Sequence, residues 1–427
     1  MLRNKPLSLQ LFALALILAL VCTQSVSLAA PMAAAPFVGD EILISERSSE
    51  EYSPAIAYNS NHNEYLVVWE NVWPGGHHDV YAQRVSSTGQ LLSWFAVASN
   101  SNRQMEPSVA YDPVNDRYLV VWLYDVWGNG SDWDVYGRFI PWSGPSASLA
   151  DFMICNWISN QAHPNVVYAR AQEEYLVVWM SASSGIPSYI SARRVFAGGG
   201  FPTNNGFLVS SGPEKRDFPD VTYNLARNEY LVVWDVEKAS LDIWGLRLTG
   251  SGIALGGGEF VIAGWPAKEE RPAVAACSQA DQYLVAWQSD QDTGGTDFAI
   301  YARYLNGDAI PGNVYMVVDT TLPQVQVDVA ADANGQRYLL AWQDKYTSLK
   351  YGVWARGAYP DETMPPDFEV IPPGSGANRE FPVIAGGRTS YLVAWEHQRS
   401  GGGNRDIHGR LLRYVAYLPL VRRQFWN

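Results

Sequence analysis

The chain has 427 residues, of which 17% are charged and 13% aromatic, and its formal net charge at pH 7 is −13. The acidic balance excludes nucleic acid and anionic membranes as expected partners, because both attract clustered lysine and arginine. The apolar and aromatic content is ample for a large core, which excludes a disordered chain.

The first 29 residues are typical of a secretory signal peptide. Arg3 and Lys5 precede an apolar run over Leu11–Cys22, and small residues follow at Ser27–Ala29. The run is too short to span a bilayer comfortably, although an uncleaved anchor is the alternative interpretation. We therefore expect a secreted or cell-surface protein that is not inserted in a membrane after cleavage, with a linker over residues 30–36.

A five-residue pattern, Tyr-Leu-Val-Val-Trp or a close variant, recurs along the chain. Its seven copies are Tyr65–Trp69, Tyr118–Trp122, Tyr175–Trp179, Tyr230–Trp234, Tyr283–Trp287, Tyr338–Trp342 and Tyr391–Trp395. The tryptophans that end them are about 55 residues apart, a period that is typical of solenoids, propellers and repeat arrays. We expect the repeated Trp and Tyr rings to be buried between neighbouring units.

Each repeat contains four segments that predict β-strands. The first begins at a proline in most repeats, as in Pro54–Tyr58, where the missing N–H does no harm. The Tyr-to-Trp segment is the second, because its β-branched and aromatic residues are bounded by turn residues. A third strand, such as Asp79–Ala82, always has Ala or Gly in fourth place, which indicates close approach of another element. A Gly-rich turn leads to a fourth strand, such as Phe152–Cys155.

Four antiparallel strands in about 50 residues form one blade of a β-propeller. The seventh repeat lacks a fourth strand, and we expect Glu41–Ser45 to supply it, because an incomplete blade would leave an open sheet edge. The predicted fold is therefore all-β: a seven-bladed β-propeller of four-stranded antiparallel blades over residues 37–413. The N-terminal strand completes the C-terminal blade, and a tail over residues 414–427 follows.

The segments Tyr65–Trp69 and Asp79–Val85 resemble repeats of exported bacterial propeller proteins of unassigned function. The resemblance covers Phe37 to about Arg413, and it implies an architecture rather than an activity. The repeat marks of WD40, kelch and sialidase propellers are absent as patterns. Cys155 and Cys277 belong to different repeats, so we expect two buried free thiols rather than a disulfide.

Aromatic and polar side chains on the connecting loops predict a ligand-binding face. Tryptophan mixed with Asp, Asn, His and Gly suits ligands with apolar faces and hydroxyl edges, such as sugars. The alternative is that these rings pack over blade edges. The candidate ligand-binding residues are Trp73, His77, Trp127, Trp133, Trp157, Trp265, Tyr346, His397 and Arg399. We predict an exported, non-catalytic, monomeric propeller that binds glycan or a protein surface.

The sequence is compatible with two further kinds of site. A secreted polysaccharide hydrolase or lyase, acting at the channel mouth, is the alternative function, because paired carboxylates cleave glycosides; the sequence assigns no catalytic residue to it. Asp290, Asp292 and Asp297 have calcium-like spacing. They lack the full ligand set of an EF-hand, so calcium is a candidate cofactor and no other cofactor is predicted.

Overall fold

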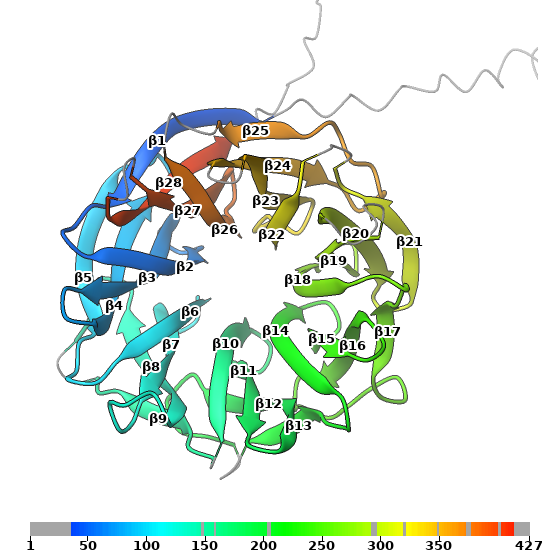
Figure 1. Ribbon diagram of the computed structural model, residues 1–427, viewed down its shortest axis with the longest axis horizontal. Coiled ribbons are helices and arrows are strands. Elements are labelled where there is room, and N and C mark those ends of the chain that lie inside the picture. The colour runs from blue at the N-terminus through cyan, green and yellow to red at the C-terminus, as the bar shows by residue number, and fades with distance from the viewer. Residues whose placement is uncertain are drawn as a thin grey trace, which may run out of the picture. The chain divides into compact units, whose positions relative to one another are not determined.

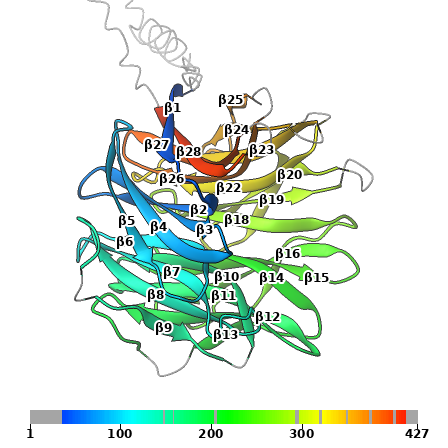
Figure 2. The ribbon, with the colours of Figure 1, turned by 60° about the vertical axis from the view of Figure 1, so that its left-hand side comes forward.

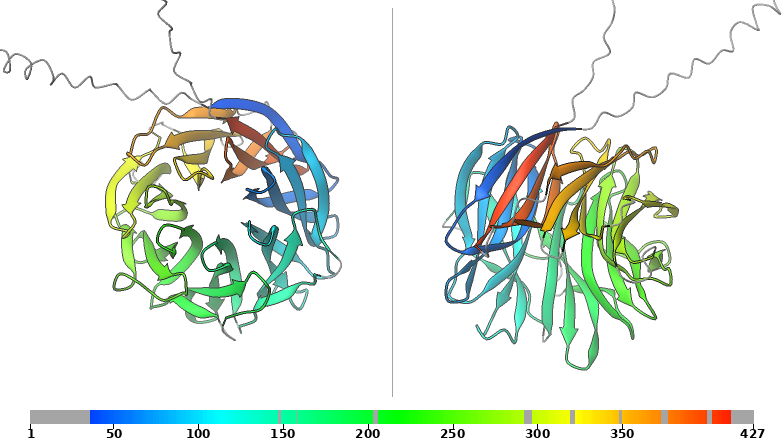
Figure 3. Two further views of the ribbon diagram at one scale, coloured as in Figure 1. Left: turned by 180° about the vertical axis from the view of Figure 1, so that it is seen from behind. Right: turned by 45° about the horizontal axis from the view of Figure 1, so that its top comes forward.

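The computed structural model describes residues 36–413, apart from 147–148, 158, 203–205, 292–296, 319–321, 348–349, 373–376 and 400–402. The described residues form seven four-stranded antiparallel sheets around a central axis and contain no helix (Figure 1, Figure 3). Accordingly, no described helix is long and apolar enough to cross a membrane. The predicted signal peptide, most of the linker and the tail lie outside the described residues.

Six sheets, blades 1 to 6, follow chain order. Their strands are β2 (Glu50–Asn59), β3 (Glu64–Trp73), β4 (His77–Ser86) and β5 (Leu91–Ala98); β6 (Gln104–Asp112), β7 (Arg117–Asp125), β8 (Trp133–Pro141) and β9 (Phe152–Cys155); β10 (Asn160–Ala169), β11 (Glu174–Ser183), β12 (Ile186–Phe196) and β13 (Phe207–Ser210); β14 (Lys215–Asn224), β15 (Glu229–Glu237), β16 (Leu241–Thr249) and β17 (Phe260–Ala263); β18 (Glu269–Cys277), β19 (Gln282–Ser289), β20 (Ala299–Asn306) and β21 (Pro311–Met316); β22 (Gln324–Ala331), β23 (Tyr338–Thr347), β24 (Lys350–Ala358) and β25 (Phe368–Ile371).

Blade 7 joins the two ends of the described chain. It contains β26 (Asn378–Gly386), β27 (Ser390–Gln398), β28 (Arg405–Arg413) and β1 (Phe37–Ser45), in the order β26-β27-β28-β1. β1 lies beside β28 (Figure 2). The register pairs Ile42 with Gly409 and Ser45 with Ile407. The prediction that the N-terminal strand completes the C-terminal blade is confirmed.

The repeated Tyr-to-Trp segments form the second strand of every blade. These strands are buried on both faces because neighbouring blades cover them, and all seven repeat tryptophans are at most 1% exposed. Their side chains belong to apolar clusters that join one blade to the next, such as the cluster of Trp69 with Ile44 and Ile407. The core therefore lies between the sheets, as the repeat predicts. Cys155 and Cys277 are buried and free, as expected.

The small residue in each third strand makes room for the fourth strand. A Cβ on Gly137 would lie 2.9 Å from Ile154 Cδ1, and one on Gly409 would lie 2.8 Å from Ile44 Cδ1. Real Cβ atoms do not approach so closely, so these positions must stay small. Ile44 on β1 thus takes the same place in blade 7 that Ile154 on β9 takes in blade 2.

The first strands differ from the prediction in one respect. They begin several residues before the proline, so that Pro54 lies inside β2 and not at its start. The register jumps from Tyr52 to Ala55, and the proline occupies the resulting β-bulge. A bulge leaves a residue unpaired, which is why the missing N–H is tolerated in mid-strand. The other six first strands shift register at the same place.

Candidate functional site

The first strands of the seven blades lie nearest the central axis (Figure 1). They line a central channel of about 550 Å³. Each contributes three or four consecutive residues to the wall, beginning with the residue just before the proline position. We call these seven residues the channel ring: Ser53, Glu106, His163, Phe218, Arg271, Gln326 and Phe381. Although the blades repeat, this position carries six different residue types, so the ring is chemically uneven.

Every residue of the channel ring has a left-handed backbone conformation. Their φ angles lie between 46° and 56°, at Phe218 and Gln326 respectively, and none of the seven is glycine. For a residue with a side chain this region costs about 1–3 kcal/mol, and it persists only where the surroundings impose it. Here the bulge imposes it, and all seven residues line the channel.

Side-chain acceptors hold the backbone of the ring in place. In five blades the side chain of the residue after the repeat Trp accepts a hydrogen bond from the backbone N–H of the channel-ring residue in the next blade. The donor–acceptor pairs are Glu106 N to Glu70 (3.3 Å), Arg271 N to Asp235 (3.3 Å), Gln326 N to Gln288 (2.9 Å), Phe381 N to Gln343 (3.2 Å) and Ser53 N to Glu396 (2.9 Å). Burial raises the pKa of Asp235 and of Glu396 to about 7. These acids therefore serve the architecture of the channel.

An ion-paired histidine lies on one side of the ring. His163 Nδ1 is 3.2 Å from Glu106 Oε2, and its Nε2 is 3.5 Å from Asp217 Oδ1. Burial acts to lower the pKa of His163, but the hydrogen bond and charge of Glu106, with the charge of Asp217, outweigh it and leave the pKa raised. The pKa of Glu106 is lowered, because its contacts with His163 outweigh the effect of burial. These contacts therefore favour the protonated imidazole of His163 and the ionised carboxylate of Glu106.

Aromatic rings and a guanidinium lie beside this pair. The imidazole of His163 stacks on Phe218 with centroids 4.3 Å apart, and the Arg271 guanidinium lies 4.0 Å from the centroid of the same ring. No carboxylate lies within 4 Å of the Arg271 guanidinium among the described residues. Phe381, in blade 7, lies elsewhere on the ring and is 42% exposed. The side of the mouth that contains His163 therefore presents an aromatic ring, a guanidinium and an imidazole paired with carboxylates.

Two residues after Phe218 and Gln326 of the channel ring, two carboxylates bridge neighbouring blades. Asp220 accepts hydrogen bonds from Asn165 Nδ2 (2.6 Å) and Val274 N (2.7 Å), and Asp328 accepts one from Ile384 N (2.8 Å). Burial raises the pKa of Asp220 to about 7, with the charge of Asp328 adding to it, and burial raises the pKa of Asp328 to about 6. Because the backbone N–H groups of Val221 and Val274 engage the two oxygens of Asp220, this carboxyl group has a structural role.

A second hollow, of about 820 Å³, lies where blade 2 meets blade 3. We call it the Trp groove, because Trp127 and Trp157 both line it, together with Asp132, Asp134 and Asn160. Trp127 is 70% exposed, and its Nε1 donates to Asp132 Oδ2 at 3.0 Å. That bond fixes the direction of the indole while leaving its face open. The structure thus brings two of the predicted Trp residues together.

The buried acid of the Trp groove is Asp134. It is 5% exposed, and burial, with the nearby charge of Asp132, raises its pKa to about 7. Trp157 is half-buried and packs edge-to-face on the repeat tryptophan Trp179, with centroids 6.1 Å apart. The groove therefore combines an open ring, a half-covered ring, carboxyl oxygens and amides.

Most of the other predicted ligand residues contact their own blades. Trp73 Nε1 donates to Asp79 Oδ2 at 2.7 Å, and His77 Nε2 lies 2.8 Å from Asp79 Oδ1. Trp133 lies under the Arg103 guanidinium, 5.1 Å from its ring centroid. The remaining contacts are Trp265 edge-to-face on Tyr301, Trp354 Nε1 donating to the Tyr346 hydroxyl at 2.8 Å, Arg399 ion-paired with Asp406 and Glu46, and His397 stacked on His408.

None of the nine predicted ligand residues lines the described part of the channel wall. The sequence pattern did not predict the channel ring, because its residues precede the prolines that look like strand starts. The available signal was the residue before it, which varies between repeats that are otherwise regular. At the predicted calcium loop, Asp290 accepts a hydrogen bond from Lys268 N at 2.8 Å, while Asp292 lies outside the described residues. Calcium at Asp290, Asp292 and Asp297 stays a prediction.

Neither a family model nor a curated protein matches the sequence. Among solved structures, a protein of unknown function from Dyadobacter fermentans aligns with a TM-score of 0.55 and 10% identity, over 89% of this chain and 100% of its own. The polysaccharide lyase Uly1 aligns with 0.54 and 9%, over 90% and 100%. The β-propeller domain of the Trilobed protease from Pyrococcus furiosus aligns with 0.51 and 8%, over 87% and 99%.

Because identities of 8–10% carry the fold alone, these similarities agree with a β-propeller fold and name no activity. The chain is therefore a seven-bladed β-propeller whose N-terminal strand closes the ring. The resemblance to exported bacterial YLVVW-repeat proteins has no matching family model and stays a prediction.

Proposed function

We propose that this protein is an exported, non-catalytic, monomeric propeller that binds glycan in the Trp groove. One observation carries the proposal: the indole of Trp127 is 70% exposed yet held in direction by its hydrogen bond to Asp132. A fixed, open aromatic face suits the apolar face of a sugar ring, and the surrounding carboxyl and amide groups suit its hydroxyl edges.

The carboxylates near the hollows favour binding over hydrolysis. Asp134 is 5% exposed, and Asp132 is engaged by the Trp127 indole. In the channel, Glu106 is paired with His163, and Asp220 is held by backbone N–H groups. A glycosidase needs one carboxylic acid and one carboxylate free to reach the scissile bond. The similarity to the lyase Uly1 is a likeness of fold and adds no catalytic residue.

A protein surface is the second class of ligand that we predict for this face. The Trp groove supports it less than glycan, because large protein interfaces bury clusters of aromatic anchors. Of the two tryptophans among the described residues that line the groove, Trp127 is widely exposed and Trp157 is half-buried. Among the predicted rim tryptophans, Trp73, Trp157 and Trp265 are engaged with their own blades.

The test is a glycan array with the protein lacking residues 1–29, followed by titration of the best ligand. Trp127→Ala should weaken binding by about 2 kcal/mol, roughly 30-fold, because one anchor ring is lost. Trp94→Ala is the matched control, since Trp94 is 55% exposed but lies on β5 outside the groove. No bound glycan, or equal losses in the two variants, would overturn the proposal.

A further inference from the structure

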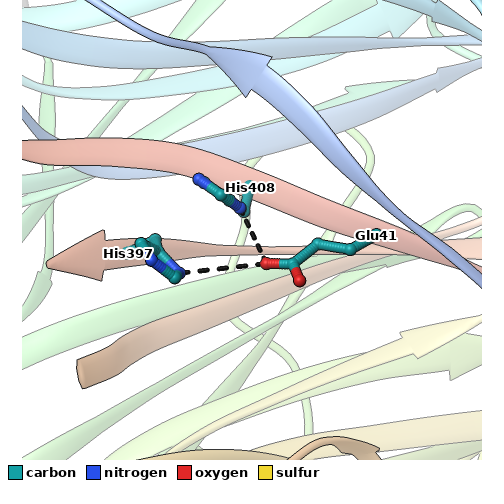
Figure 4. A group of neighbouring side chains, drawn as sticks. All are labelled: Glu41, His397 and His408. Atoms are coloured by element: carbon teal, nitrogen blue, oxygen red, sulfur yellow. Dashed lines mark hydrogen bonds and ion pairs between the residues drawn. The ribbon is translucent and has the colours of Figure 1, made fainter. Parts of the chain in front are cut away.

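A histidine-rich cluster lies in the closing blade, away from the Trp groove and the channel. Glu41 is on β1, His397 is near the end of β27 and His408 is on β28 (Figure 4). Leu43 and Trp395 both pair with His408 in the strand register. Glu41 and His397 are therefore diagonal neighbours of His408, two residues from its partners. Residues two apart share a sheet face, so all three side chains project from one face of three adjacent strands.

The three side chains converge on one oxygen. His408 Nδ1 is 2.7 Å and His397 Nδ1 is 3.8 Å from Glu41 Oε1, and one ligand atom from each residue lies within 4.8 Å of the other two (Figure 4). The imidazole rings stack with centroids 4.1 Å apart. Donors in a tetrahedral zinc site, with bonds of about 2.0–2.1 Å, lie about 3.3 Å apart. Small side-chain adjustments would therefore bring these atoms around one cation.

A simple ion pair accounts for only part of the cluster. The hydrogen bond between Glu41 and His408 satisfies those two residues, but His397 Nδ1 is buried and has no hydrogen-bond partner among the described residues. In its neutral form such an imidazole nitrogen offers a lone pair that suits metal ligation.

The surrounding charges set the kind of cation. Arg379 and Arg399 both act against positive charge at His397, although Arg399 is itself paired with Asp406 and Glu46. Calcium and magnesium bind chiefly to oxygen and would gain little from two imidazoles. Zinc and its neighbours in the first transition row are the divalent cations that imidazole ligands suit.

We propose that Glu41, His397 and His408 form a binding site for a late-transition divalent cation, with Zn²⁺ the best match. Three protein ligands leave a fourth position for water. Glu41 belongs to the N-terminal strand and the histidines belong to the last two strands. A bound cation would therefore link the strands that close the ring. The site is separate from the Trp groove, and its success or failure does not depend on glycan binding.

The experiment is calorimetric titration of Zn²⁺ into protein purified without a histidine tag, with melting curves in parallel. His408→Tyr is the ligand variant, because Tyr81, Tyr136 and Tyr301 occupy the same register position opposite the repeat Trp of other blades. It should therefore fold with an unchanged metal-free Tm. His62→Asn removes an exposed histidine that pairs with Asp116, and serves as the control.

We expect one saturable Zn²⁺ site in the wild type and a Tm that rises with Zn²⁺ by mass action. His408→Tyr and Glu41→Gln should weaken binding by more than about 10-fold, since even outer-shell changes cost 10–100-fold. His62→Asn should bind like the wild type, and Ca²⁺ should not compete. The proposal is overturned if the wild type shows no saturable site, or if His408→Tyr binds Zn²⁺ as tightly as the wild type does.

Discussion

Replacing Ile44 tests whether β1 seals the ring. The side chain is 2% exposed and packs in the cluster between blades 7 and 1 with Ile407 and Trp69. Its Cδ1 lies against Gly409, as the Cδ1 of Ile154 lies against Gly137 in blade 2. If β1 is a full structural equivalent of a fourth strand, the two isoleucines should contribute similarly to stability.

The size of the effect follows from the carbons that Ile44→Ala removes. Three methyl or methylene groups at about 0.8 kcal/mol each, with the cavity left behind, give a loss of about 2–5 kcal/mol in the free energy of unfolding. Unfolding roughly 380 residues at about 2.1 cal/mol/K each gives an entropy near 0.8 kcal/mol/K, so Tm should fall by about 3–6 °C.

The assay is differential scanning calorimetry of three variants with the wild type. Ile154→Ala should lose about as much Tm as Ile44→Ala. Leu43→Ala is the matched control on the same strand, because Leu43 is 39% exposed, and its loss should stay below about 1 kcal/mol. A normal Tm for Ile44→Ala beside a lowered Tm for Ile154→Ala would refute the reasoning, since β1 would then contribute no sealing contact.

Two further predictions concern buried charge. Glu269, Asp220 and Glu396 have folded-state pKa values raised to about 8, 7 and 7. The folded state then holds protons that the unfolded chain releases, so stability should fall as pH rises from about 4.5 to 8. Melting curves check this, and a Tm that is higher at pH 8 than at pH 5 would contradict it. Separately, Glu106→Gln should lower the pKa of His163 in an NMR titration, and more than Asp217→Asn does; an unchanged His163 pKa would show that the Glu106 contact does not set it.

The strands could be predicted from the sequence because every blade buries the same pattern of apolar and aromatic residues. Phe152–Cys155 and Phe260–Ala263 are fourth strands with the bounds expected from sequence, since turn residues limit them on both sides. The start of the first strands was missed by several residues. Pro54 looks like a strand boundary, but the bulge that accommodates it depends on pairing with the second strand, which no local pattern reveals.

The binding sites were harder to predict from the sequence than the strands were. Trp127 and Trp133 look equivalent in sequence, yet one indole is open and the other lies under the Arg103 guanidinium. Whether a loop tryptophan packs or projects depends on what the neighbouring blade places beside it. His397 was recognised as a functional candidate, but its neighbour Glu41 lies more than 350 positions earlier and could not be connected with it.

The sequence by itself determined the blades, their number and their closure, because a regular aromatic period can be buried only by stacking like sheets until the last meets the first. The tertiary structure alone decided which side chains meet. The channel ring gathers one residue from each blade, and the cluster of Glu41, His397 and His408 joins the two ends of the described chain. Such contacts depend on the strand register and on closure of the ring. Register and closure bring together residues that are far apart in the sequence.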